Sequence, residues 1–84
     1  MSYSLLILPR AKRQLADLPA QQLSAAEAKI RALQENPRPV GCKKLRDRQG
    51  WRVRFGDYRI IYKIDDAQKI VTILEVGHRR EIYR

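Results

Sequence analysis

The stretch that decides the fold reads W-R-V-R-F-G-D-Y-R-I-I-Y and spans residues 51–62. Its first five residues alternate apolar and cationic side chains, which predicts a strand over Trp51–Phe55 with one face in a core and the other in water. Gly56 and Asp57 form a turn signal, and residues 58–64 are rich in the aromatic and β-branched side chains that favour a second strand. The stretch therefore predicts a β-hairpin.

The arginines of this hairpin are predicted to share one face. Counting alternate residues along each strand places Arg52 and Arg54 on the face opposite Trp51, and it places Arg59 on the same face as the other two arginines. Three guanidinium groups on one sheet face repel one another, so their presence favours anion binding over a role in stability. A merely solvated strand face is the alternative for Arg52 and Arg54 taken alone.

Two helical patterns lie on the N-terminal side of the hairpin, after a short apolar run at residues 3–8 that predicts a strand. Residues 10–18 carry apolar side chains at i, i+4 and i+7, and residues 20–36 repeat apolar side chains on one stripe, so both are predicted to be amphipathic helices. The second helix is expected to end before Pro37, because the residue ahead of a proline avoids helical geometry. The short link between them predicts a helical hairpin that needs a sheet to lie against.

Further strand patterns lie on either side of the predicted β-hairpin. The run I-V-T-I-L-E-V at residues 70–76 predicts a well-buried strand, and residues 42–45 predict a short edge segment. Short turns join consecutive strands in antiparallel pairs, so the sequence predicts an α+β fold in the order β-α-α-β-β-β. Two helices would cover one face of a small, mainly antiparallel four-stranded sheet. With no linker or repeat, residues 1–84 are expected to form one domain.

The composition is strongly basic, with 18 Lys and Arg against 9 Asp and Glu and a net charge of +9. Such a surplus predicts a polyanionic partner, most often nucleic acid. A membrane partner is not expected, because no stretch is long and apolar enough to span a bilayer and no signal peptide is evident. The single cysteine, Cys42, excludes an internal disulfide, is expected to be a small buried side chain and agrees with a cytoplasmic location.

The side chains available for chemistry are arginine, tyrosine and histidine. One His and one Cys cannot supply a zinc site, and the Asp65-Asp66 pair is more typical of a turn than of a magnesium site, so no metal and no cofactor are expected. Guanidinium groups suit phosphate because they are planar and donate hydrogen bonds in pairs. RNA carries its own nucleophile, the 2′-hydroxyl, so a nuclease without a metal is expected to cut RNA.

Proton transfer would fall to His78 or Tyr83, and the sequence does not decide between them. His78 also fits a surface loop, and Tyr83 also fits a hydrophobic plug at the sheet edge.

Several segments together carry a family resemblance: K-K-L-R at 43–46, W-R-V-R at 51–54, D-Y-R-I-I-Y at 57–62 and V-G-H-R-R-E-I-Y-R at 76–84. Over essentially the whole chain they resemble the RelE branch of the RelE/ParE toxin superfamily. The resemblance implies the toxin of a type II toxin–antitoxin system, an endoribonuclease that cuts mRNA on the ribosome without a metal and leaves a 2′,3′-cyclic phosphate. The partners it implies are the ribosome and mRNA, an acidic, extended, RelB-like antitoxin, and operator DNA reached only through the antitoxin complex.

The same resemblance assigns residue roles. It places Arg59 and Arg79 at the arginines that grip the scissile phosphate and Tyr83 at the tyrosine that orients the nucleotide. Arg52 and Arg54 stand where well-known members have two lysines, and arginine cannot act as a base, so His78 becomes a candidate for that role. The predicted catalytic residues are Arg54, Arg59, His78, Arg79 and Tyr83. The predicted RNA-binding residues are Lys44, Arg46, Arg52 and Arg80.

Two other functions fit the resemblance. ParE-like members share the fold but inhibit DNA gyrase and lack the nuclease residues. A catalytically inactive relative would act only as an antitoxin-bound transcriptional co-repressor. The presence of Arg59, Arg79 and Tyr83 together favours the nuclease.

Overall fold

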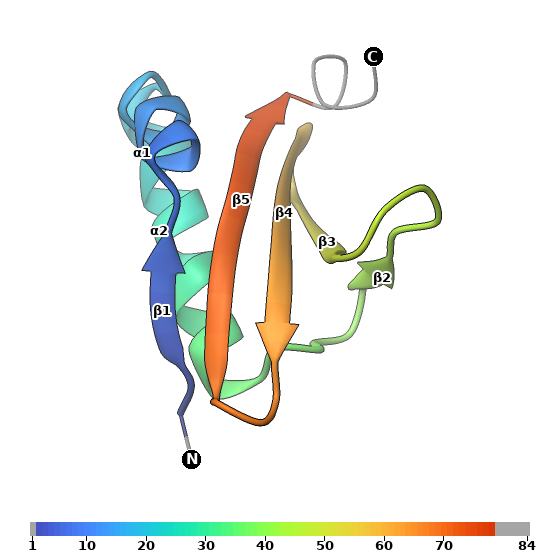
Figure 1. Cartoon of the computed structure of the whole chain (residues 1–84). Coiled ribbons are helices and arrows are strands. Elements are labelled where there is room, and N and C mark those ends of the chain that lie inside the picture. The colour runs from blue at the N-terminus through green and yellow to red at the C-terminus, as the bar shows by residue number, and fades with distance from the viewer. Residues whose placement is uncertain (1, 79–84) are drawn as a thin grey trace.

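The computed structural model describes residues 2–78, which form two helices packed on one face of a five-stranded sheet (Figure 1). The elements in chain order are β1 (Ser4–Ile7), α1 (Pro9–Ala16), α2 (Ala20–Glu35), β2 (Lys43–Lys44), β3 (Trp51–Phe55), β4 (Tyr58–Asp65) and β5 (Ile70–His78). The strands lie in the order β1-β5-β4-β3-β2, and only the β1–β5 pair is parallel. The predicted α+β class and mainly antiparallel sheet are confirmed.

The prediction of four strands is wrong by one strand. The additional strand is β2, which pairs Lys43 with Arg52 and Lys44 with Trp51 at the edge of the sheet. Two residues are too few to show an alternating pattern, so the sequence indicated only a short edge segment there. In addition, β5 continues past its predicted end at residue 76, because Gly77 and His78 still pair with β4.

The helices begin and end as their prolines allow. Pro9 lies in the first turn of α1, where the missing N–H group costs no intrahelical hydrogen bond. Asn36, directly before Pro37, has extended backbone geometry and ends α2. The helix residues buried against the sheet follow the predicted stripes: Ala11, Leu15, Ala26, Ile30 and Leu33. Neither helix in the described part of the chain has the length and apolarity needed to cross a membrane.

The predicted β3–β4 hairpin is present. Gly56 has a φ of +58°, and a glycine at the first of two turn residues is typical of a type II′ hairpin turn. Val53 faces the core, whereas Arg54 is exposed. Tyr62 is fully buried, and its hydroxyl donates a hydrogen bond to the carbonyl oxygen of Pro37 at 2.6 Å. Burial raises the pKa of Tyr62, so this phenol remains a neutral donor.

A β-bulge reverses the alternation within β5. Tyr62 pairs with Ile73, whereas the preceding residue, Ile61, pairs with Glu75, so Leu74 is an extra residue on β5. Ile73 faces the core, and the extra residue turns Glu75 to the opposite face of the sheet. Without the bulge, strict alternation from Ile73 would have turned Glu75 towards the helices.

Candidate nucleic-acid interface

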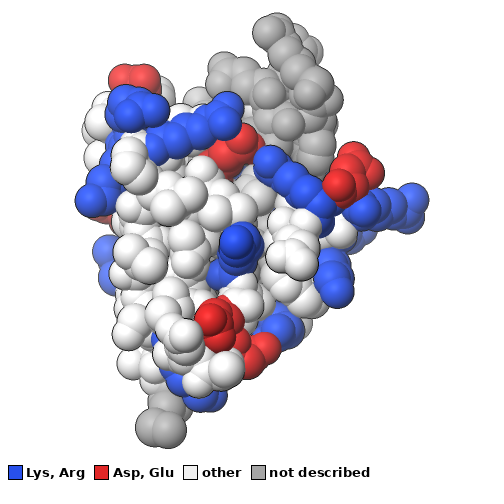
Figure 2. All heavy atoms as spheres, in the orientation of Figure 1, with Lys and Arg blue, Asp and Glu red and all other residues white. Residues whose placement is uncertain are grey.

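The sheet face that the helices leave uncovered carries basic side chains from neighbouring strands. We call it the open face, and its central residues are Lys43, Arg52, Arg54, Arg59, Ile61 and Glu75. Arg54 lies directly opposite Arg59, and Arg52 lies directly opposite Lys43, so each pair shares a face. Figure 2 shows that the margin over β2, β3 and the loop joining them carries mostly Lys and Arg. The predicted grouping of Arg52, Arg54 and Arg59 on one face is therefore present.

Arg59 differs from its expected environment. The sequence predicted a solvated side chain, but Arg59 is only 7% exposed. Its strand, β4, lies between β3 and β5, where its direct partners are Arg54 and Gly77. The Nη1 atom donates to the carbonyl oxygen of Tyr58 at 3.5 Å. The result is a guanidinium group held within the sheet surface, next to the exposed Arg54.

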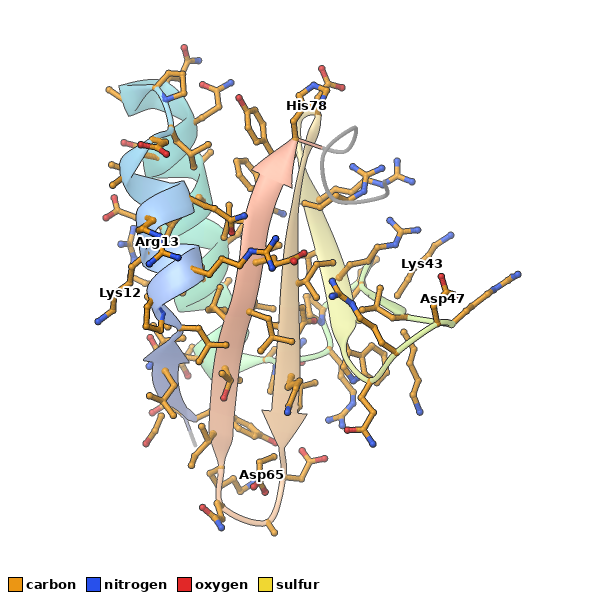
Figure 3. All side chains as sticks on the ribbon, turned by 45° about the horizontal axis from the view of Figure 1, so that its top comes forward. Lys12, Arg13, Lys43, Asp47, Asp65 and His78 are labelled. Carbon is orange, nitrogen blue, oxygen red and sulfur yellow. The ribbon has the colours of Figure 1, made fainter. Side chains whose placement is uncertain are left out.

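His78 does not join these arginines. In the register it lies opposite Tyr58, and the two rings meet edge to face with centroids 5.6 Å apart. Tyr58 in turn stacks on the core residue Phe55, with centroids 5.3 Å apart. His78 therefore lies on the helix-covered side at the end of β5, whereas Arg54 and Arg59 lie on the open face (Figure 3).

The predicted RNA-binding residues are also divided between locations. Arg52 lies on the open face, but Lys44 pairs with Trp51 and so turns to the other side of the sheet. Its neighbour Lys43 takes the place beside Arg52, and only the pairing of β2 with β3 could have identified it. Arg46 is exposed in the loop between these strands. The predicted residues Arg79, Arg80 and Tyr83 lie outside the described residues.

One carboxylate interrupts the open face. The side chain of Glu75 is 12% exposed, and its oxygens form ion pairs with Arg10 at 3.2 Å and with Arg48 at 3.1 Å. Arg10 comes from α1 and Arg48 from the β2–β3 loop, so the contact joins three separate parts of the chain. This cluster could not be predicted from the sequence, because the pattern of residues 70–76 does not reveal the bulge that turns Glu75 to the open face.

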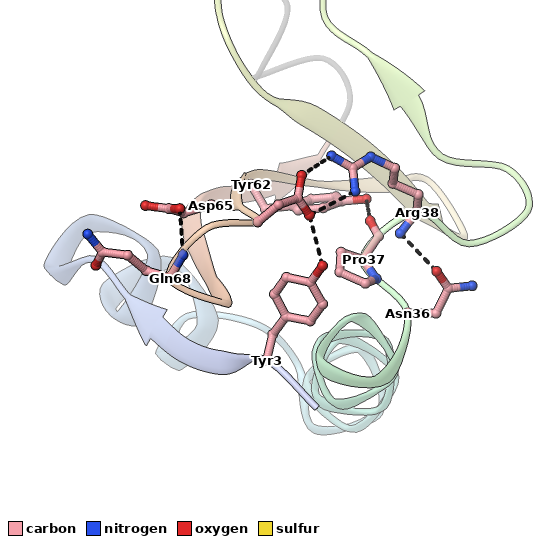
Figure 4. Close-up of polar contacts among 8 residues, drawn as sticks. Tyr3, Asn36, Pro37, Arg38, Tyr62, Asp65 and Gln68 are labelled. Carbon is pink, nitrogen blue, oxygen red and sulfur yellow. Dashed lines mark hydrogen bonds and ion pairs between the residues drawn. The ribbon is translucent and has the colours of Figure 1, made fainter. Parts of the chain in front are cut away.

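A polar cluster around Asp66, at the β4–β5 turn, holds separate segments of the chain together (Figure 4). Asp66 accepts two hydrogen bonds from Arg38, at 3.2 and 2.9 Å, and one from the Tyr3 hydroxyl at 2.8 Å. The Arg38 guanidinium also lies 5.2 Å from the centre of the Trp51 ring. These contacts tie the N-terminal segment and the segment after α2 to the β4–β5 turn, where Asp65 accepts a hydrogen bond from the Gln68 N–H group, as predicted for a turn.

Replacing Asp66 with asparagine is expected to remove a pH dependence of stability. Hydrogen bonds from Arg38 and then from Tyr3 lower the pKa of Asp66 from 3.8 to about 2. A lowered folded-state pKa means that the ionised carboxylate stabilises the fold above pH 3.8, and that this contribution is lost as the pH falls through about 2. Urea unfolding at a series of pH values should give a larger free energy of unfolding for wild type than for the variant. This difference should shrink as the pH falls through this window.

Asp65→Asn is the matched control, because it removes the same charge from the same turn and keeps the contact between Arg38 and Asp66. The Asp65→Asn variant should therefore still lose stability as the pH falls through the same window, as wild type does. A gap between wild type and Asp66→Asn that stays constant across the pH series would contradict the assignment.

Within residues 2–78, no three His, Cys, Asp or Glu side chains come together as a metal-binding group. Cys42 is half-buried and packs against the core, close to the role expected of it.

Known proteins are similar to this chain in both sequence and fold. A family model described as the ParE toxin of type II toxin–antitoxin systems, parDE, matches residues 5–83. Toxin RelG of Mycobacterium tuberculosis is 38% identical over 86 residues, which cover 100% of this chain and 99% of RelG. A chain of the RelBE2 toxin–antitoxin complex of the same organism has 34% identity and a TM-score of 0.82, with 94% of this chain and 100% of that chain covered. A chain of the archaeal RelE–RelB complex of Pyrococcus horikoshii has 27% identity and a TM-score of 0.83, with coverages of 94% and 97%. The chain therefore belongs to the ParE toxin family of type II toxin–antitoxin systems, and it is a RelE-type toxin of the RelE/ParE superfamily.

Proposed function

We propose that this RelE-type toxin inhibits translation by cutting mRNA on the ribosome and leaves 2′,3′-cyclic phosphate ends. The observation that carries the proposal is the pair formed by Arg54 and Arg59, which lie directly opposite each other on the open face. A phosphodiester laid across this pair would receive hydrogen bonds from two planar, charged donors. The net charge of +9 would also draw a polyanion to the surface before it docks.

In the proposed reaction the 2′-oxygen of the RNA forms a bond to phosphorus, and the bond from phosphorus to the 5′-oxygen breaks. A base takes the proton of the 2′-hydroxyl, and an acid gives a proton to the departing 5′-oxygen. Arg54 and Arg59 stabilise the negative charge that grows on the non-bridging oxygens, which accelerates the reaction because this charge is greatest in the transition state. Arg79 is proposed to join them.

Tyr83 and His78 are the proposed proton-transfer groups. His78 packs against Tyr58 on the helix-covered side, away from Arg54 and Arg59, which supports Tyr83 as the base. Tyr83 follows Arg79 and Arg80 in the sequence, and neighbouring cations favour the ionised phenol. Because so few groups can move protons, a ribosome that holds the message in attack geometry would supply a large part of the rate.

We also propose a RelB-like antitoxin as partner. The similar solved chains from M. tuberculosis and P. horikoshii come from complexes of a toxin with its antitoxin. An acidic, extended antitoxin laid over the open face would relieve the repulsion among its arginines and would block the RNA site. Operator DNA would be reached only through this complex.

The deciding experiment maps the 5′ ends of transcripts after induced expression in a bacterial host. New ends inside translated reading frames are expected, together with cyclic phosphate on the upstream fragments made with purified ribosomes. A message without a start codon is the control and should stay intact. Double-strand DNA breaks without new mRNA ends would instead identify a ParE-like gyrase inhibitor. If neither new mRNA ends nor DNA breaks appear, the co-repressor role is the alternative that remains.

A further inference from the structure

The β2–β3 loop, residues 45–50, is held by two different contacts. At its base the Leu45 N–H group donates to the carbonyl oxygen of Gly50 at 3.0 Å. Gly50 has a φ of +128°, and a Cβ atom there would lie 3.0 Å from the carbonyl oxygen of Tyr62, so only glycine lets the loop run this close to β4. Beyond the base, Arg48–Glu75 is the one ion pair that residues 46–49 make within the described range 2–78.

This ion pair crosses the open face. Glu75 lies on β5 and the loop leads into β3, so the contact reaches from one side of β4 to the other. The β4 residue at this level is Ile61, which pairs with Arg52 on one side and with Glu75 on the other. Ile61 is 0% exposed, although it is not part of the core between sheet and helices. The Arg48–Glu75 ion pair thus crosses β4 at Ile61, two residues from Arg59, and two residues of a strand span about 7 Å.

A carboxylate is an unexpected group on a surface proposed to bind RNA, because it repels phosphate. Both oxygens of Glu75 are engaged by arginines, so its charge is directed at its own partners. The side chain of Arg48 is 49% exposed and has further N–H groups to donate. An arginine fixed in this way loses less conformational entropy on binding a phosphate than one on an untethered loop.

We propose that Glu75 is a positioning residue for RNA binding: it holds Arg48 and the β2–β3 loop over the open face, where Arg48 binds a phosphate beside the one held by Arg54 and Arg59. This inference rests on the proposed function. A purely repulsive role for Glu75 predicts the opposite result, since removing the negative charge would then strengthen RNA binding.

The test compares Glu75→Gln, Arg48→Ala and the double variant in mRNA cleavage on purified ribosomes. Glu75→Gln should lower kcat/KM by about tenfold, the effect of losing one charge-assisted hydrogen bond, even though it makes the protein more basic. Arg48→Ala should lower it by a similar factor, and the double variant should lose no more, because both changes act through one contact. Hydrogen exchange at the amides of residues 46–49 should become faster in Glu75→Gln.

Arg10→Ala is the matched control. It removes a cation from the same carboxylate but leaves the Arg48–Glu75 pair, so loop exchange and cleavage should stay within about twofold of wild type. Thermal unfolding of every variant confirms that it is folded. Unchanged or faster cleavage by Glu75→Gln, additive losses in the double variant or unchanged loop exchange would overturn the inference. Wild-type protein that cuts no mRNA would refute the proposed function instead, and the exchange comparison would still report whether Glu75 holds the loop.

Discussion

Replacing Arg59 with alanine is expected to lower the rate of mRNA cleavage by about 100- to 1,000-fold, the range found when one preorganised donor to a transition-state charge is removed. Arg59 lies in β4 between two neighbouring strands, and its Nη1 atom donates to the carbonyl oxygen of Tyr58, so the guanidinium is restrained before it meets a phosphate. Arg54, directly opposite, is exposed and cannot replace a donor fixed at that position. Single-turnover cleavage on programmed ribosomes measures the loss.

Two control variants separate chemistry from charge and folding. Arg59→Lys keeps the charge but loses the planar pair of donors, so an intermediate rate is expected. Lys12→Ala removes one positive charge from α1, in the helix layer away from the open face, and should leave the rate unchanged (Figure 3). Because Arg59 is buried, the unfolding midpoint of each variant is measured as well. A folded Arg59→Ala protein that cuts at the wild-type rate would remove Arg59 from the site.

Replacing Ile73 with alanine is expected to lower the free energy of unfolding by about 2–5 kcal/mol. Ile73 is 0% exposed and pairs with Ile7 on β1 and with Tyr62 on β4, so the lost methyl groups leave a cavity where three strands meet. For so small a domain this is a large share of a total near the lower end of about 5–15 kcal/mol. Urea unfolding followed by circular dichroism measures the change.

A smaller truncation and an exposed site provide the comparison. Ile73→Val should cost about 0.5–1.5 kcal/mol, in proportion to the volume lost. Leu6→Ala changes a leucine of the same sheet that is 53% exposed, and should cost less than about 1 kcal/mol. Equal losses at residues 6 and 73 would mean that the core is not centred where the strands place it.

The parts of the fold that follow from local signals could be predicted from the sequence. The alternation in residues 51–55 and the turn at Gly56 were enough to predict the hairpin, and Pro37 marked the end of the second helix, because each acts on its immediate neighbours. The strand β2 could not be predicted in this way. Two residues have no period, and their strand character exists only because β3 lies beside them.

The site was predictable only as far as the alternation continued unbroken. Counting along the hairpin correctly placed Arg54 and Arg59 on one face. In β5, however, the extra residue at Leu74 turns Glu75 onto the open face and, by the same shift, turns His78 away from it. The burial of Arg59 could not be predicted either, because the alternation of its own strand places it on the face that the helices leave uncovered.

The pairing of β1 with β5 has a consequence for how the chain acquires its shape during synthesis. β1 leaves the ribosome before the other described elements, yet its partner residues, beginning with Ile70 opposite Ser4, emerge only after both helices and the hairpin. Joining segments this far apart is slow, because the entropy of closing a long loop must be lost before any stabilising contact forms. Until β5 emerges, the nascent polypeptide carries an unpaired leading segment that chaperones and proteases can reach. The emergence of β5 therefore sets the earliest moment at which the sheet of a newly made molecule can be fully paired.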